Sequence, residues 1–144
     1  SLLGFFHLLG GNFYWGQTRL YDLYFLEGII RYDNLVHTYA TFIATLTLYS
    51  LLNNFIDEKI RSRYPLFALG LILMALGMGA INELLELFAV LAFGVTQQVG
   101  DYFNNAFDIL FNTIGASLAT VIIYFYIERP RFIKKINAET KPNN

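Results

Sequence analysis

The chain has 144 residues, a net charge of −1, two histidines and no cysteine. Hydrophobic residues make up 56% of it and charged residues 15%, whereas soluble domains have about 45–50% and about 25%. This composition excludes the polar shell that a soluble domain of this size needs. The net charge gives no electrostatic basis for nucleic-acid binding, and the lack of cysteine excludes disulfides, thiolate metal sites and a cysteine nucleophile.

The first apolar segment, residues 1–10, is too short to cross a membrane. As a helix it would be about 15 Å long, half the thickness of a bilayer core. It starts without Met, so we expect either a partial span with a missing start or a segment that dips into one leaflet. The connection to residue 33 is aromatic, and its Tyr14 and Trp15 are typical of the headgroup level.

Three further segments are long enough to cross a bilayer: residues 34–55, 66–93 and 105–127. They show no strand-like alternation, and a spanning segment must satisfy its own backbone hydrogen bonds, so we predict helices. The predicted fold class is all-α: an integral membrane helical bundle with three full spans plus an N-terminal partial span. Residues 1–136 would form a single transmembrane domain, and residues 137–144 a polar cytoplasmic tail.

The basic residues divide unequally between the two sides that three crossings define. Eight of the ten lysines and arginines lie in residues 53–64 or after the third span, which we expect to end at Arg129 and Pro130. Only Arg19 and Arg31 lie on the other side. The positive-inside rule then predicts a multi-pass protein of the inner or plasma membrane with a cytoplasmic C-terminus. We interpret the basic C-terminal segment as a topology determinant, with contact to anionic lipid as a second interpretation.

Polar residues gather near the outer ends of the spans at intervals of three and four, which place them on one helix face. In chain order they are Asp33 and His37; Glu83 and Glu86; and Asp101, Asn105, Asp108 and Asn112. His7 would emerge on the same side if its segment also crosses. Ionisable residues inside a span cost about 2.5–3.5 kcal/mol on insertion scales and normally face a bundle interior, a partner or water.

Carboxylates this close together cannot all stay ionised at low dielectric without compensation. Shared protons, salt bridges to Arg31 or Arg19, and a bound cation would each compensate. Our main hypothesis is a divalent-cation or proton site formed by Asp33, His37, Glu83, Glu86 and Asp108, with His7, Asp101, Asn105 and Asn112 as additional polar residues. Oxygen-rich ligands with histidine and no cysteine suit Mg²⁺, Mn²⁺, Ca²⁺, Fe²⁺ or Zn²⁺, so the predicted cofactor is a divalent metal ion of unidentified kind.

Each of these residues also has a simpler interpretation. Asp33 and Asp101 stand where helix-capping residues are common. Glu83 and Glu86 would be interfacial residues near the outer headgroups. His37 would be a membrane-interface histidine.

The order and spacing of four short motifs resemble the YjdF-like family of polytopic bacterial and archaeal inner-membrane proteins, over about residues 6–127. The motifs are His7–Gly11, Arg31–His37, Asn82–Glu86, and Gly100-Asp101 followed by Asp108 and Asn112–Ala116. The resemblance implies a membrane fold but no activity, because the role of that family is unassigned. Similar proteins often carry a second acid where this chain has Asn104 and Asn105, which weighs against a two-metal centre, and they are longer at the N-terminus.

Three functions remain open. The first is a subunit or assembly factor of a larger membrane complex, with the polar cluster holding the bundle together. The second is a metal-dependent membrane enzyme acting on a lipid or isoprenoid, although no catalytic residue can be named. The third is a cation or proton transport component, which the apolar inner halves of the spans disfavour. The expected partners are the lipid bilayer and other membrane subunits or further copies of the chain, with no nucleic acid.

Overall fold

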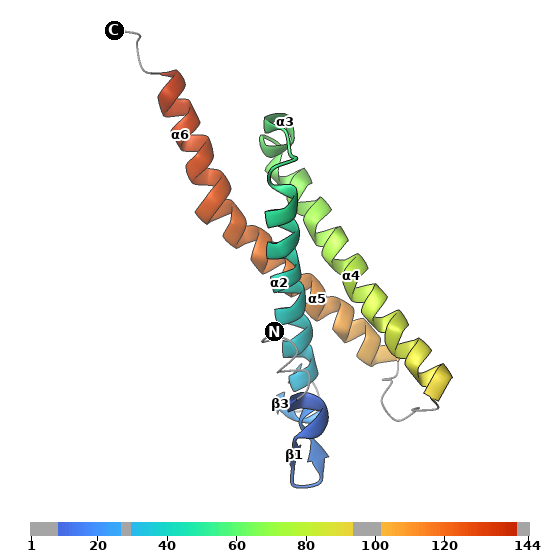
Figure 1. The fold of residues 1–144 in the computed structure, drawn as a ribbon. Helices are drawn as coiled ribbons and strands as arrows, with labels where there is room; N and C mark the ends of the chain where they lie inside the picture. The colour runs from blue at the N-terminus through green and yellow to red at the C-terminus, as the bar shows by residue number, and fades with distance from the viewer. Residues whose placement is uncertain (1–8, 27–29, 94–101, 141–144) are drawn as a thin grey trace.

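Figure 1 shows the chain as a computed structural model, which describes residues 9–26, 30–93 and 102–140. The main helices are α2 (Tyr32–Leu52), α4 (Tyr64–Phe93) and α5 (Tyr102–Ile123). Three helices are long and apolar enough to cross a membrane, the third being α5 with its continuation. The structure thus confirms an all-α membrane bundle with three candidate spans.

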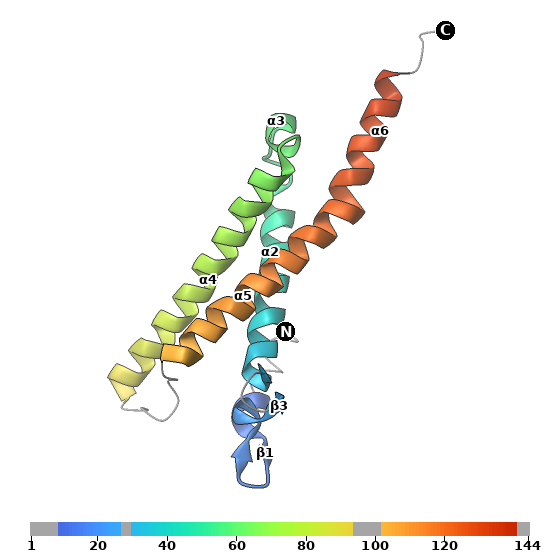
Figure 2. The ribbon, with the colours of Figure 1, turned by 180° about the vertical axis from the view of Figure 1, so that it is seen from behind.

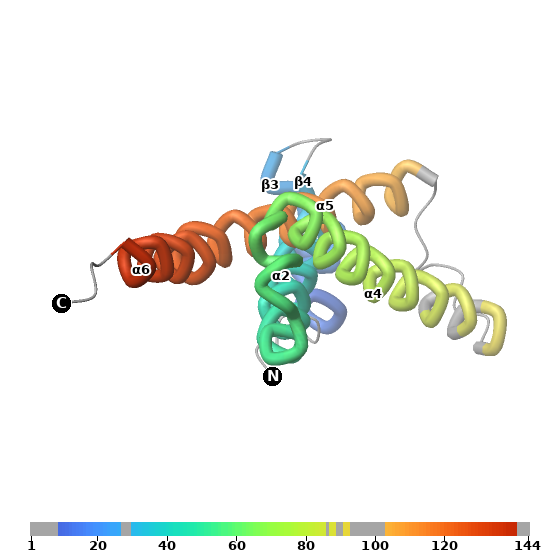
Figure 3. Tube along the Cα trace, turned by 90° about the horizontal axis from the view of Figure 1, so that it is seen from above, coloured from blue at the N-terminus to red at the C-terminus, as the bar shows by residue number. Residues whose placement is uncertain are grey.

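Helix α2 stands at the centre of the bundle, and α4 and α5 both pack against it (Figures 1 and 2). Viewed from above, α4 and the end of α6 diverge to opposite sides of α2 (Figure 3). The start of α2 lies at one end of the bundle. We call the opposite end, which holds residues 53–63 and the start of α6, the basic end.

Helices α2 and α5 approach closely because small residues face each other. A side-chain carbon placed on Gly115 of α5 would lie 2.1 Å from the backbone oxygen of Thr38 on α2. Ala116 and Ala119 continue this buried face. Thr41 of α2 is also buried in this contact. Its hydroxyl donates to the backbone carbonyl of His37 at 2.8 Å, so the buried hydroxyl has a hydrogen-bond partner.

The basic end has an apolar core and, beside it, a buried ion-pair network. Tyr49, Phe67, Leu71 and Ile123 form the core. Arg61 closes the short helix α3 (Glu58–Arg61) and donates to Glu128 at 2.6 Å, while the Tyr49 hydroxyl donates to the same carboxylate oxygen at 2.6 Å. The sequence analysis did not single out Glu128.

The third helix continues beyond the boundary that Arg129 and Pro130 were expected to set. A π-helical turn, η3 (Tyr124–Glu128), leads directly into α6 (Arg129–Glu139). Pro130 lies in the first turn of α6, where a missing backbone N–H is tolerated. Residues 137–139 of the predicted tail are therefore helical.

The aromatic connection before α2 contains short strands that the sequence analysis did not predict. Strand β1 (Tyr14–Trp15) pairs with β2 (Thr18–Arg19) around Gly16, whose φ of 66° suits glycine. The 3₁₀ helix η1 (Leu20–Asp22) follows, and then β3 (Tyr24–Leu26) pairs with β4 (Ile30–Arg31). Strands of two or three residues are too short to produce a period-2 pattern.

Candidate functional site

The start of α2 places two of the predicted site residues one turn apart. Asn34 caps the helix, because its side-chain oxygen accepts the backbone N–H of Arg31 at 2.9 Å. Asp33 lies in the first turn of α2, one helical turn before His37. The distance from Asp33 Oδ1 to His37 Nε2 is 3.6 Å.

His37 Nε2 is the point at which the three main helices meet. Asp108 Oδ1 of α5 lies 3.7 Å from it, and Glu83 Oε1 of α4 lies 4.0 Å from it. Within the described residues, ligand atoms of Asp33, His37 and Asp108 all lie within 4.8 Å of one another. Of the five predicted ligands, the fold thus brings four to one place: Asp33, His37, Glu83 and Asp108.

Asp108 is the most deeply buried of these acids, and amide groups hold both of its oxygens. Its side chain is 2% exposed. Asn104 donates to Oδ2 at 2.9 Å, and Asn34 donates to Oδ1 at 3.4 Å. Arg31 in turn donates to the side-chain oxygen of Asn104. These contacts fix the orientation of the Asp108 carboxylate toward His37.

The second ring nitrogen of His37 faces an amide on α5. His37 Nδ1 lies 3.3 Å from Asn112 Oδ1. Asn112 in turn packs against α4, since a side-chain carbon on Gly79 would lie 2.7 Å from its Nδ2. A partner on the second nitrogen of a metal-binding histidine typically sets the ring orientation, and Asn112 stands in that position.

Not every predicted site residue can be placed. His7 and Asp101 lie outside the described residues, and so does the side chain of Glu86, although its backbone belongs to α4. Asn104 contacts Asp108 and Arg31 and therefore belongs to the cluster. The residue that the sequence analysis predicted is its neighbour on α5, Asn105. Asn34 and Asn104 were missed as site residues because their role depends on contacts between helices. Arg31, which was considered as a salt-bridge partner of the carboxylates, donates to Asn104.

The spacing of the cluster is compatible with a single metal ion. Cation–ligand bonds of about 2.0–2.6 Å place neighbouring ligand atoms about 3–4 Å apart. The distances of 3.6, 3.7 and 4.0 Å around His37 Nε2 fall in this range. A protonated histidine among ionised carboxylates would adopt similar distances, so the geometry alone allows either arrangement.

The fold and this cluster define a polytopic α-helical membrane protein with a buried polar site. The family model described as "Predicted membrane protein (DUF2238)" matches residues 1–129, and the chain belongs to that family. This confirms the predicted relationship to a membrane protein family of unassigned function. No curated protein and no solved structure matches the chain.

Proposed function

We propose that this chain is a membrane protein that binds one divalent cation through Asp33, His37 and Asp108, with Glu83 as a fourth ligand. The proposal rests on the convergence of these side chains, from α2, α4 and α5, on His37 Nε2. Three carboxylates beside one imidazole leave negative charge that a divalent cation would neutralise. The site would favour a metal that accepts oxygen and imidazole ligands.

The cation would tie the three spans together within a subunit or assembly factor of a larger membrane complex. A site with ligands on three helices stabilises their packing, because binding to the folded state alone raises its stability. The exposed surface of α4 carries large apolar side chains such as those of Leu73, Leu84 and Leu85. Lipid or another membrane subunit would cover them.

A metal-dependent enzyme acting on a lipid or isoprenoid is the second candidate. The side chains of Asp33 and Glu83 are 20% and 22% exposed, so the surrounding helices do not fully enclose the site. A bound ion would activate water or polarise a phosphoryl oxygen. A co-purifying protein in fixed stoichiometry would favour the subunit, and metal-dependent turnover of a lipid would favour the enzyme.

Transport through a single chain has less support. The core at the basic end, formed by Tyr49, Phe67, Leu71 and Ile123, is apolar and buried. A polar path from the cluster to the basic end would have to pass these side chains. A transport role would therefore need a path between several chains.

The orientation belongs to the same proposal. The distribution of Lys and Arg supports a cytoplasmic basic end in an inner or plasma membrane and a cluster facing the outer leaflet. Because the chain has no cysteine, single introduced cysteines report topology directly. Asn137→Cys should react only with reagents that reach the cytoplasm, and Gln17→Cys only with reagents outside. The opposite labelling pattern would refute this orientation.

The cation site itself can be tested by titrating detergent-purified, metal-free protein with Mn²⁺ and measuring free Mn²⁺ by electron paramagnetic resonance. We expect one site per chain, and at least a hundredfold loss of affinity in Asp108→Asn. Asp57→Asn, which changes the charge equally at the basic end, should bind like the unmodified chain. Equal titrations for all three proteins would refute the site.

A further inference from the structure

Two asparagine side chains connect Arg31 to the cation cluster. The Arg31 guanidinium donates to the side-chain oxygen of Asn104, whose amide nitrogen donates to Asp108 Oδ2 at 2.9 Å. The backbone N–H of Arg31 donates to the side-chain oxygen of Asn34 at 2.9 Å, and Asn34 Nδ2 donates to Asp108 Oδ1 at 3.4 Å. The guanidinium is therefore only two hydrogen bonds away from the most deeply buried carboxylate of the cluster.

The segment before α2 holds this guanidinium in place. Arg31 belongs to β4 and is paired with Tyr24 of β3. The central guanidinium carbon lies 5.6 Å from the centre of the Tyr24 ring, which is the distance of a cation–π contact. The aromatic ring and the hydrogen bond to Asn104 fix the guanidinium from two sides. The positive charge of Arg31 therefore has a defined position beside the cluster.

The position of this charge is unfavourable for α2 itself. Arg31 immediately precedes the helix. The N-terminus of a helix carries a partial positive charge, which attracts acidic side chains and repels basic ones. The favourable electrostatic interaction of Arg31 is therefore with the carboxylates of the cluster and not with the helix that it precedes.

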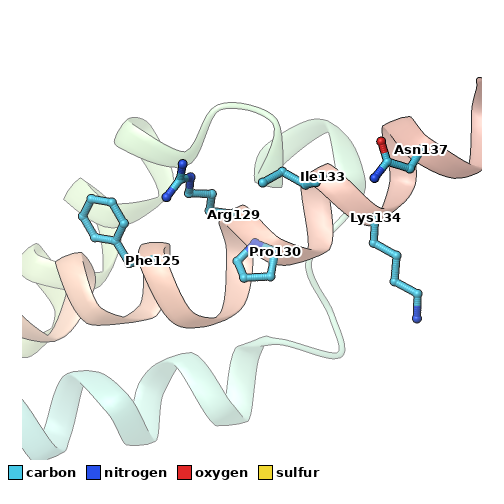
Figure 4. A pocket seen from close by; sticks show the side chains of 6 residues that line it. All are labelled: Phe125, Arg129, Pro130, Ile133, Lys134 and Asn137. Atoms are coloured by element: carbon cyan, nitrogen blue, oxygen red, sulfur yellow. The ribbon is translucent and has the colours of Figure 1, made fainter.

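The other basic residues lie elsewhere in the fold. Of the ten lysines and arginines, only Arg19 and Arg31 precede α2 in the sequence. Arg19 pairs with the exposed carboxylate of Asp22 at 3.1 Å. Figure 4 shows two residues of the basic end, Arg129 and Lys134, which extend to opposite sides of α6 along its open surface. Among the described residues, Arg31 is therefore the basic residue whose charge adds to that of the cluster.

The charges of the cluster and of Arg31 match a divalent ion. A carboxylate must be ionised, and a histidine neutral, to coordinate a metal. The three carboxylates that surround His37 Nε2 together with one guanidinium then have a net charge of −2. One divalent cation neutralises this charge, whereas a trivalent cation leaves the site with a net positive charge. Uncompensated charge is costly in a site as buried as this one.

We propose that Arg31 sets the charge selectivity of the cation site, by opposing ions of higher charge than a divalent cation. This inference rests on the proposed cation site. The repulsion between the guanidinium and a bound ion is proportional to the charge of the ion. Removal of the Arg31 charge therefore raises the affinity for every cation, and most for the ion of highest charge. A role limited to orienting Asn104 predicts the opposite sign, because loss of an orienting contact lowers the affinity for all cations.

The test is a titration of the detergent-purified, metal-free chain with Mn²⁺, followed by displacement of the bound Mn²⁺ with La³⁺. Electron paramagnetic resonance measures free Mn²⁺ in both steps. Arg31→Gln and Arg31→Met remove the charge, and Arg31→Lys keeps it. Arg19→Gln is the control, because it removes the same charge from the same segment outside the cluster. Melting curves followed by circular dichroism verify that each variant folds.

We expect Arg31→Gln to bind Mn²⁺ about tenfold and La³⁺ about thirtyfold more tightly than the unmodified chain. Arg31→Met should show the same increase in the ratio of La³⁺ to Mn²⁺ affinity. Arg31→Lys and Arg19→Gln should leave that ratio within twofold of the value for the unmodified chain.

A loss of affinity by the same factor for both ions in Arg31→Gln would overturn the proposal, because Arg31 would then only orient Asn104. An unchanged ratio in both neutral variants would also overturn it. If Asp108→Asn abolishes Mn²⁺ binding while Arg31→Gln has no effect, the cation site stands and only the role of Arg31 is refuted. Absence of Mn²⁺ binding in the unmodified chain would refute the cation site and this inference together.

Discussion

His37 Nε2 and Asp108 Oδ1 lie 3.7 Å apart where α2 and α5 meet, and amide side chains hold both residues in place. Asn104 donates to Asp108, and Asn112 lies 3.3 Å from the other ring nitrogen of His37. The pair is thus fixed from both sides before any ligand arrives. Ligand side chains that are already held in place bind a cation more tightly, because binding then costs less side-chain conformational entropy.

The role of Asn104 can be separated from that of its neighbour. Asn104→Ala removes the amide that donates to Asp108 at 2.9 Å, and it should lower cation affinity by about 10–100-fold, as loss of an outer-shell partner typically does. Asn105→Ala on the next helix position is the control and should change affinity less than threefold. The measurement is the Mn²⁺ titration. A larger effect from Asn105→Ala would contradict the orientation of α5.

Gly79→Ala tests the contact between α4 and Asn112. The added carbon would lie 2.7 Å from Asn112 Nδ2, the end of a side chain that can move. Asn112 should therefore shift away from His37, which lowers cation affinity roughly tenfold. The fold should remain intact. Gly77→Ala adds a carbon in open space on the same helix and should leave affinity unchanged. If both variants bind like the unmodified chain, Asn112 does not position His37.

Gly115→Ala tests the close packing of α2 and α5. The added carbon would meet the Thr38 backbone oxygen at 2.1 Å, so the helices must separate. We expect a loss of about 1–3 kcal/mol in the free energy of unfolding, as for other overpacked contacts. Gly70→Ala adds a carbon with nothing nearby and should stabilise α4 by about 0.5–1 kcal/mol through helix propensity. Unfolding in mixed micelles measures both, and equal stabilities would contradict the contact.

Glu128→Ala should destabilise the basic end strongly. The side chains of Arg61 and Glu128 are only 10% and 6% exposed. Loss of one partner of a buried pair costs about 3–5 kcal/mol, because the remaining charge stays buried. The same unfolding measurement applies.

The matched control for this network is Glu58→Gln, which breaks the exposed pair with Lys135. Exposed pairs contribute about 0–1 kcal/mol, so the control should unfold almost like the unmodified chain. A similar small loss in Glu128→Ala would mean that Glu128 is accessible to solvent.

The long apolar runs were sufficient to predict the three candidate spans. The polar residues near one end of these runs indicated that Asp33, His37, Glu83 and Asp108 lie close together. Helical spacing placed Asp33 and His37 on one face of a helix, and the length of the apolar runs identified three candidate spans. The distances within the cluster could not be predicted, because they depend on how closely the small residues around Gly115 let two helices approach.

The features that sequence analysis missed depend on contacts between distant segments. Glu128 stands in a basic segment whose charges were interpreted as a topology signal, and its partner Arg61 is 67 positions away. Asn104 was passed over because the polar stripe was counted from Asp101. A residue four positions before Asp108 lies one turn away on the same face, and Asn104 occupies that position. Only the packed structure shows which of two adjacent amides faces α2.

The most direct test of the central claim is elemental analysis of the purified chain beside its Asp108→Asn variant. We predict close to one equivalent of a divalent metal per chain, lost in the variant, while Asp57→Asn retains it. Absence of metal from the unmodified chain, even after incubation with Mg²⁺, Mn²⁺, Ca²⁺, Fe²⁺ and Zn²⁺, would contradict the cation site. The cluster would then be a network of protonated or ion-paired side chains that holds the bundle together.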